Sequence, residues 1–212
     1  MIYVLPGMGA DSSMFTGAWR QLPGAVFIDW PPYAGETTLA EIASRVITHY
    51  AIPADTDAVV IGTSLGGMVA CEIANQLRLR RLILIGSATH PSEINPLLTA
   101  LQPLARFAPV NALQWSVPAV PGELGAMFSR VQPDFLRASI RAVFQWPGIS
   151  PSLPPPLRIH GRRDLVIPPP PAPDLLLDGG HLIAMTHARE CCDFITASLQ
   201  LSFASATPSS RS

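Results

Sequence analysis

Six short runs of almost uninterrupted apolar residues recur along the chain, and helical stretches separate several of them. A strand with one solvated face alternates apolar and polar residues, whereas a strand covered on both faces is apolar throughout. Strands of the second kind that alternate with helices predict a mostly parallel α/β sheet with helices on both faces. The predicted strands are residues 2–5, 25–28, 58–61, 82–85, 157–159 and 175–177, and the predicted helices are residues 38–50, 66–77 and 186–199.

One segment, residues 92–147, departs from this alternation. It contains no convincing strand, it is rich in Leu, Ala, Phe, Trp and Met, and prolines divide it into short helices. We therefore predict a helical cap inserted between two parts of one core, residues 1–91 and 148–202. The residues after 203 are small and polar, so residues 203–212 are expected to form a disordered tail.

Composition excludes several chemistries. The 212 residues include no Lys, so neither a Schiff base nor a phosphate-loop Lys is available. A formal charge of −1 gives no basic field for nucleic acid. Cys71, Cys191 and Cys192 are too few and too poorly spaced for a disulfide framework or a zinc site. Since the sequence has no leader pattern and no run of 18 apolar residues, we expect a cytoplasmic protein without a membrane span, metal or cofactor.

Residues 62–67, Gly-Thr-Ser-Leu-Gly-Gly, carry the clearest chemical meaning. They follow a predicted buried strand and begin a predicted helix, which is the setting in which a G-x-S-x-G motif holds a serine in a strained turn. Gly62 and Gly66 would let neighbouring backbone pass without a Cβ clash. The N–H of Leu65 would lie at a helix N-terminus, where free donors stabilise an oxyanion. Ser64 is the candidate nucleophile; the alternative is a glycine-rich helix start without chemistry.

A nucleophilic serine needs a base, and the chain offers five histidines. In a site of this type the order along the chain is Ser, acid, His, which excludes His49. His160 ends a predicted strand, where a core role is expected, and His187 falls in the predicted C-terminal helix as a surface or capping residue. His181 follows the last predicted strand through two glycines, at the sheet edge where open α/β sheets keep their sites. We therefore predict His181 as the base.

The candidate acid is Asp164, in the turn after the fifth predicted strand and on the same sheet edge as His181. A carboxylate there can accept the Nδ1 proton of His181 and stabilise the imidazolium that forms during attack. The alternative for Asp164 is a turn aspartate bonded to its own backbone. Asp174 and Asp178 are too close to His181 in sequence to reach its ring, and Glu93, after the fourth predicted strand, is the reserve acid.

A second oxyanion donor is expected from the loop after the first predicted strand. Gly7 and Gly9 allow its backbone to approach the site and leave the N–H of Met8 free to point at it. Asp11 in the same loop precedes a predicted helix start. We therefore expect Asp11 to be an N-cap residue rather than a catalytic one.

Together these segments resemble the α/β-hydrolase fold superfamily, and the resemblance extends to about residue 199. It rests on four segments in the expected order: the loop 5–11, the elbow 62–67, the acid turn 160–168 and the Gly-Gly-His turn 179–181. A Pro-rich run, residues 168–173, replaces the helix that usually separates the acid from the histidine. The resemblance implies a reduced α/β-hydrolase fold with Ser64 as nucleophile, His181 as base, Asp164 as its partner, and the N–H groups of Met8 and Leu65 as the oxyanion hole.

The same resemblance implies a serine hydrolase that cleaves a small to medium acyl or alkyl ester through an acyl-enzyme intermediate. In fold and size the chain resembles the small esterases that act on pimeloyl-carrier-protein methyl esters. Acyltransferase or thioesterase activity would use the same residues and is not separated from ester hydrolysis by the sequence. The alternative from another class is a hydrolase-fold receptor that binds a ligand without turnover.

The predicted cap supplies apolar side chains that could line a pocket over the nucleophile. The candidates are Met127, Phe128 and Trp146. Three arginines with spacings of seven and four share roughly one helical face: Arg130, Arg137 and Arg141. This face could meet an acidic acyl carrier protein, although a solvated face is the simpler interpretation.

Overall fold

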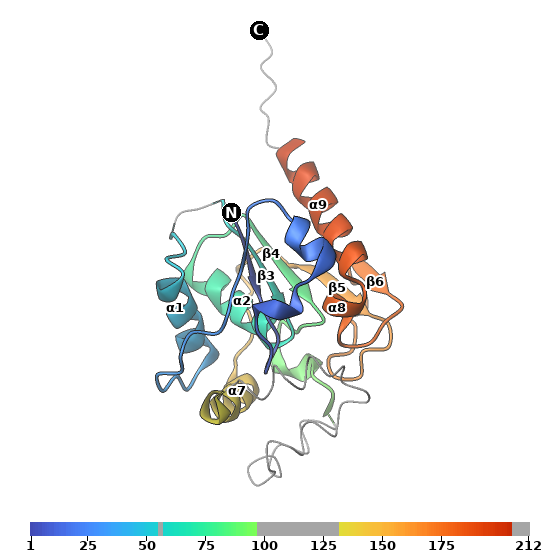
Figure 1. Ribbon diagram of the computed structural model, residues 1–212. Coiled ribbons are helices and arrows are strands. Elements are labelled where there is room, and N and C mark those ends of the chain that lie inside the picture. Colours follow the sequence, from blue (N-terminus) through green and yellow to red (C-terminus); the bar gives the residue numbers. More distant parts are fainter. Residues whose placement is uncertain (55–56, 97–131, 205–212) are drawn as a thin grey trace.

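The computed structural model describes residues 1–54, 57–96 and 132–204 (Figure 1). Its centre is one sheet of six strands, all parallel, in the order β2-β1-β3-β4-β5-β6. The strands are β1 (Ile2–Leu5), β2 (Ala25–Phe27), β3 (Val59–Thr63), β4 (Arg81–Ile85), β5 (Leu157–Gly161) and β6 (Leu175–Leu177). The predicted α/β class and the six strands are confirmed.

Helices cover both faces of the sheet (Figure 1). On one face lie α1 (Leu39–His49), α2 (Leu65–Gln76) and α7 (Pro133–Gln145); on the other lie α8 (Ile183–Thr186) and α9 (Ala188–Ala204), together with the 3₁₀ helices η1 (Ser12–Met14) and η2 (Gly17–Gln21). Each face has its own hydrophobic core, and β3 contributes to both: Val60 packs in the first core, and Val59 and Ile61 pack in the second. Burial on both faces explains why the strands are apolar throughout.

Helix α1 begins at a capping box. The hydroxyl of Thr38 accepts a hydrogen bond from the Glu41 N–H, and the Glu41 carboxylate accepts one from the Thr38 N–H in return. Two N–H groups that lack helical acceptors are thereby paired. The predicted start of this helix at residue 38 is its cap.

The predicted C-terminal helix, residues 186–199, differs from the structure in both boundaries. A break at His187, with φ −127° and ψ 40°, separates the single turn α8 from α9. Helix α9 then continues to Ala204, two residues into the segment predicted as a tail, because Leu, Gln and Ala in this stretch favour helix. The rest of that segment, residues 205–212, lies outside the described residues.

Helix α7 makes up most of the described part of the predicted cap. Pro133 occupies its first turn, where the missing N–H leaves no helical bond unmade. Phe135 is buried, and its ring packs against those of Trp30 and Tyr33, with centroids 5.4 and 6.2 Å away. Most of the predicted cap, residues 97–131, lies outside the described residues, so the division into core and cap stays a prediction.

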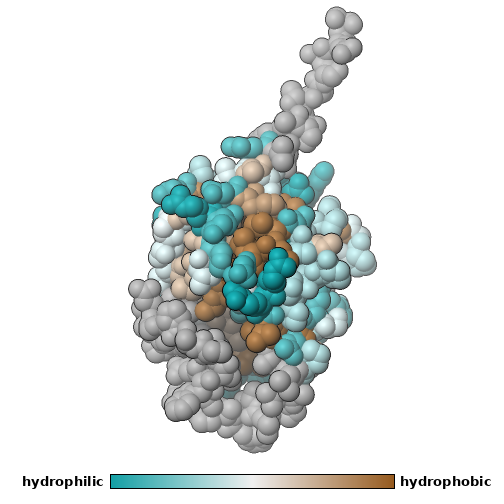
Figure 2. Space-filling view, turned by 90° about the vertical axis from the view of Figure 1, so that its right-hand side faces the viewer, coloured by the Kyte–Doolittle hydropathy of each residue, from teal (hydrophilic) through white to brown (hydrophobic). Residues whose placement is uncertain are grey.

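The strand β6 forms one edge of the sheet and carries three half-buried leucines. The molecule seen from that side shows a hydrophobic strip bordered by hydrophilic side chains (Figure 2).

Residues 147–173, all of which the structure describes, contain β5 but no helix, as the proline content predicts. Within the described residues, no helix is both long enough and apolar enough to cross a membrane.

Candidate active site

Ser64 lies at the junction of β3 and α2 in a strained backbone conformation. Its φ of 50° and ψ of −121° make it one of two non-glycine residues with positive φ among the described residues. An L-residue is held there only when its surroundings enforce it. A Cβ at Gly62 would come within 3.0 Å of the Gly66 backbone, and a Cβ at Gly66 would come equally close to the Pro6 carbonyl. Gly62 therefore permits the tight turn around Ser64, and Gly66 permits the end of β1 to pass close to the start of α2.

Three side chains predicted from the sequence meet in the structure. The Ser64 Oγ is 2.9 Å from Nε2 of His181, and Nδ1 of His181 is 2.8 Å from Oδ2 of Asp164. Because a carboxylate only accepts hydrogen bonds, Nδ1–H donates to Asp164, which leaves Nε2 as the acceptor for the Ser64 hydroxyl. The histidine is thus held in the tautomer that can take a proton from the serine.

Asp164 is fixed from two directions. While Oδ2 faces His181, Oδ1 accepts hydrogen bonds from the N–H groups of Val166 and Ile167, both at 2.9 Å. The side chain is fully buried. Asp164 therefore binds its own turn through one oxygen, as the alternative interpretation predicts, while the other oxygen is placed to orient the histidine. Its role as the catalytic acid stays a prediction.

The acid turn and the histidine turn also contact each other through backbone. The N–H of Arg163 donates to the Gly179 carbonyl at 2.9 Å, and a Cβ at Gly161 would come within 3.0 Å of the Gly180 carbonyl. This contact is possible because β5 and β6 are neighbours in the sheet. The Pro-rich run needs only to connect adjacent strands, so the helix it replaces is not required to bring the two residues together.

Gly86, which no sequence pattern identified as a site residue, packs against the His181–Asp164 pair. It follows β4 with a φ of 51°. A Cβ there would lie 3.4 Å from Oδ2 of Asp164, 3.7 Å from Nδ1 of His181 and 3.2 Å from the His181 carbonyl. From the sequence alone, Gly86 is only a glycine directly after a buried strand. Its closeness to Asp164 and His181 can be inferred only when the order of the strands in the sheet is known.

The segments that carry the two predicted oxyanion donors, Met8 and Leu65, both lie close to Ser64. Leu65 is the first residue of α2, so its N–H has no acceptor within the helix. The loop after β1 forms a turn in which the Ala10 N–H donates to the Gly7 carbonyl and Gly9 has a φ of 75°, which leaves the Met8 N–H outside the turn's own bond. A Cβ at Gly7 would be 3.5 Å from that of Ser64, so this loop passes directly over the serine.

The other candidate groups have structural partners. Asp11 caps η1 by accepting from the Ser13 N–H at 2.9 Å, as predicted. Asp178 is exposed and pairs with Arg163. The carboxylate of Asp174 accepts from the Arg158 N–H at 2.7 Å.

Glu93, the reserve acid, belongs to the 3₁₀ helix η3 (Pro91–Glu93) and forms an ion pair with Arg158 rather than with a histidine. His187 separates α8 from α9, and its Nδ1 is 2.8 Å from the Thr186 hydroxyl.

His160 is fully buried on β5, as expected of a core position. Neither ring nitrogen has a hydrogen-bond partner within the described part of the chain. Burial, aided by the nearby charge of Arg158, lowers the pKa of His160 to about 4. The ring is therefore neutral at neutral pH, and the histidine that is bonded to the Ser64 hydroxyl is His181, not His160.

Trp146, a candidate pocket residue, is buried beside α2. Its indole N–H donates to the Glu72 carboxylate at 2.6 Å, and the amide of Asn75 donates to the same oxygen at 3.0 Å. The indole thus stabilises a buried carboxylate, and a pocket role for Trp146 stays a prediction. Met127 and Phe128 lie outside the described residues. In the part of the chain that is described, no group of three His, Cys, Asp or Glu side chains could hold a metal ion.

Comparison with known families agrees with this fold. Residues 2–194 match the family described as the alpha/beta hydrolase family. The chain belongs to this family. No curated protein sequence gives a match to this α/β hydrolase.

Solved structures share the fold at low sequence identity. An esterase from Thermogutta terrifontis is 18% identical, with 95% of this chain and 89% of that chain covered and a TM-score of 0.68. An enol-lactonase from Burkholderia xenovorans LB400 is 18% identical, with 94% and 91% covered and a TM-score of 0.70. A type II thioesterase from the yersiniabactin NRPS/PKS pathway is 19% identical, with 95% and 93% covered and a TM-score of 0.59.

Proposed function

We propose that this α/β hydrolase is a serine carboxylesterase that cleaves small to medium acyl or alkyl esters through an acyl-enzyme intermediate. The observation that carries the proposal is the unbroken hydrogen-bonded series from Ser64 through His181 to Asp164, beside a strained serine at the start of α2. A structural serine needs neither an oriented histidine nor a strained backbone. Their coincidence favours nucleophilic catalysis.

In the proposed first step, Oγ of Ser64 attacks the ester carbonyl carbon while its proton passes to Nε2 of His181. The negatively charged Asp164 stabilises the resulting imidazolium. The N–H groups of Met8 and Leu65 donate to the oxyanion of the tetrahedral intermediate. The intermediate then expels the alcohol, which takes the proton from His181, and Ser64 is left acylated.

In the second step, His181 takes a proton from a water molecule that attacks the acyl carbon. The second tetrahedral intermediate collapses, the proton returns to Ser64, and the carboxylic acid leaves. The apolar residues predicted in the cap favour an uncharged acyl group over a charged one.

Thioester hydrolysis is the second candidate, because one of the structurally similar proteins is a type II thioesterase from an NRPS/PKS pathway. Such a substrate would bring an acyl carrier protein as partner. Two of the three arginines that could meet such a partner, Arg137 and Arg141, are exposed on α7, as a solvated face would also be. Arg137 pairs with Asp134 on the same helix. Arg130 lies outside the described residues.

The test is a series of p-nitrophenyl esters of increasing acyl length, each with its matched thioester, against the wild-type protein and Ser64→Ala. We expect a pre-steady-state burst of p-nitrophenol equal to the enzyme concentration, and no burst from the variant. A protein that binds these esters with neither a burst nor steady-state turnover would be a receptor, and a Ser64→Ala variant with undiminished turnover would exclude Ser64 as the nucleophile. Faster turnover of the thioesters would favour the second candidate.

A further inference from the structure

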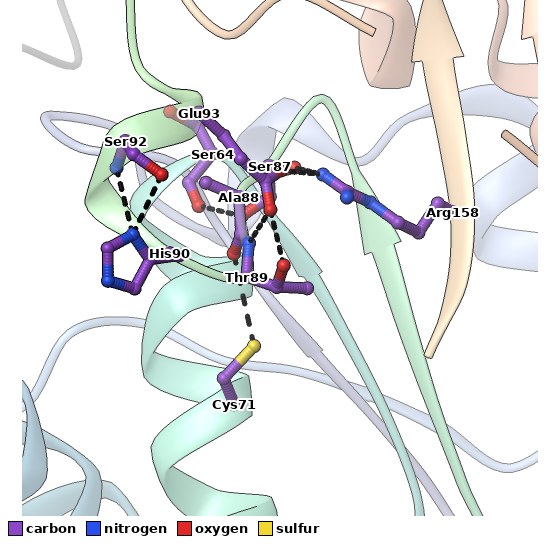
Figure 3. Close-up of polar contacts among 9 residues, drawn as sticks. All are labelled: Ser64, Cys71, Ser87, Ala88, Thr89, His90, Ser92, Glu93 and Arg158. Carbon is purple, nitrogen blue, oxygen red and sulfur yellow. Dashed lines mark hydrogen bonds and ion pairs between the residues drawn. The ribbon is translucent and has the colours of Figure 1, made fainter. Parts of the chain in front are cut away.

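The residues after β4 hold the strained serine through its backbone. The N–H of Ser64 donates to the Ile85 carbonyl at 3.1 Å. The Ser64 carbonyl accepts from the Ser87 hydroxyl at 2.7 Å (Figure 3). Ser87 is fully buried. Both peptide groups of Ser64 are thus bonded to the same short stretch of chain.

The Ser87 side chain occupies the space that a side chain at Gly67 would fill. A Cβ at Gly67 would come within 3.0 Å of both the Oγ and the Cβ of Ser87. The third glycine of residues 62–67 is therefore needed for this contact rather than for the turn itself. The hydroxyl of Ser87 can reach the Ser64 carbonyl because the start of α2 has no side chain in its way.

Ser87 is held in turn by a partly buried ion pair (Figure 3). Its carbonyl accepts from Nη2 of Arg158 on β5 at 2.9 Å, and the same nitrogen pairs with the Glu93 carboxylate. The other oxygen of Glu93 accepts from the hydroxyl of Thr89 and from its N–H at 3.3 Å. The loop between β4 and η3 is therefore closed on itself and tied to the neighbouring strand.

The pair stays charged in the folded protein. Burial alone would raise the pKa of Glu93, but the hydrogen bonds from Arg158 and Thr89 outweigh burial and lower it. The Arg158 side chain is only 13% exposed. Removing one partner of such a pair leaves a poorly solvated charge, so the loop should not keep its conformation without both.

We propose that Ser87 is a positioning residue for the Ser64 nucleophile and that the Arg158–Glu93 pair fixes Ser87 for this task. This inference rests on the proposed function. Without the Ser87 hydroxyl, the Ser64 carbonyl keeps only the bonds from the N–H groups of Gly67 and Met68 in its own helix. The tie between the strained turn and the residues after β4 is then weakened, and the Ser64 Oγ moves away from His181. Because displacements of about 1 Å can slow catalysis about 100-fold, acylation slows while substrate binding is kept.

The first experiment compares Ser87→Ala with Ser139→Ala. Ser139 is an equally buried serine on α7, and its hydroxyl has no partner among the described residues, so the second variant controls for loss of a buried hydroxyl. The rate of the p-nitrophenol burst, measured against ester concentration, gives the acylation rate constant and the substrate dissociation constant separately. We expect Ser87→Ala to lower the acylation rate constant about 10- to 100-fold at an unchanged dissociation constant. Ser139→Ala should acylate at the wild-type rate. Wild-type acylation by Ser87→Ala, or a change in the dissociation constant alone, would overturn the proposal.

The second experiment separates positioning from stability. Arg158→Leu should slow acylation and lower the Tm, and adding Glu93→Leu should recover the Tm because no buried charge is then unpaired. We expect the acylation rate of the double variant to stay low. Recovery of the rate together with the Tm would show a purely structural role and overturn the proposal.

The Ser64→Ala variant separates a failure of the positioning role from a failure of the proposed function. If Ser64→Ala is inactive and Ser87→Ala is fully active, only the positioning role fails. If Ser64→Ala is active, the proposed function itself fails.

Discussion

Substitution of Asp164 by Asn gives a sharp test of how His181 is oriented. Asn has the same shape, but only one of its two terminal atoms accepts hydrogen bonds. The N–H groups of Val166 and Ile167 both point at the Oδ1 position and require an oxygen there. The amide NH₂ must then replace Oδ2 and face Nδ1 of His181. Nδ1 would become the acceptor, Nε2 would carry the proton, and the ring could not take a proton from Ser64.

The expected loss follows from this reversal of tautomer. The same substitution in a Ser-His-Asp triad lowers kcat about 10⁴-fold with the geometry intact, which corresponds to about 5 kcal/mol of activation free energy. The two backbone hydrogen bonds to Oδ1 survive without their charge. We therefore expect the free energy of unfolding to fall by only about 1 kcal/mol.

The assay is p-nitrophenyl ester hydrolysis at pH 7, with the Tm measured on the same preparations. Asp178→Asn is the matched control, since Asp178 is an aspartate close to His181 in sequence but is exposed and pairs with Arg163. It should keep wild-type kcat. A folded Asp164→Asn variant that loses less than tenfold in kcat would refute the orientation argument.

Three further outcomes follow from buried groups. Trp146→Phe removes the indole donor from the buried Glu72 carboxylate and should lower the free energy of unfolding in urea by about 1–3 kcal/mol. A variant as stable as the wild-type protein would contradict a stabilising role for this hydrogen bond. Gly86→Ala places a Cβ 3.4 Å from Oδ2 of Asp164 at a φ of 51°. We therefore expect kcat to fall and the free energy of unfolding to drop by about 1–2 kcal/mol. An unaffected kcat would mean that Gly86 does not shape the site. The pKa of His160 is about 4 when folded, below its unfolded value, so the unfolded chain binds the proton first as pH falls. The free energy of unfolding should therefore decline by roughly 3 kcal/mol as the pH falls from about 6.5 toward 4. His160→Leu should flatten this decline. An unchanged pH profile in His160→Leu would show that other groups cause the acid sensitivity.

Much of the fold is predictable because the strands are buried on both faces and are therefore apolar throughout. The order of Ser64, Asp164 and His181 is also readable, because each follows a strand and parallel strands bring their carboxyl ends to one edge. A proline-rich connection gave no direct information on the distance from Asp164 to His181. That distance is short because β5 and β6 are adjacent, which is a property of the sheet rather than of the connection.

The missed features share one cause, which is that their partners are distant in sequence. Ser87 contacts residues 23 positions before and 71 positions after it, and no local pattern distinguishes it from an ordinary serine after a strand. Trp146 has an apolar ring suited to a pocket, yet its indole N–H is bonded to Glu72, 74 residues away. Such pairings require the order of the strands and the packing of the helices before they can be inferred.

The most direct test of the central claim is covalent labelling with a fluorophosphonate, followed by mass spectrometric mapping of the modified residue. Such a reagent reacts with serines that a histidine activates and whose oxyanion is stabilised. We predict one adduct per folded chain, located on Ser64, absent in Ser64→Ala and formed far more slowly in His181→Ala. Folded protein that stays unlabelled, or that is labelled equally fast without His181, would contradict the account.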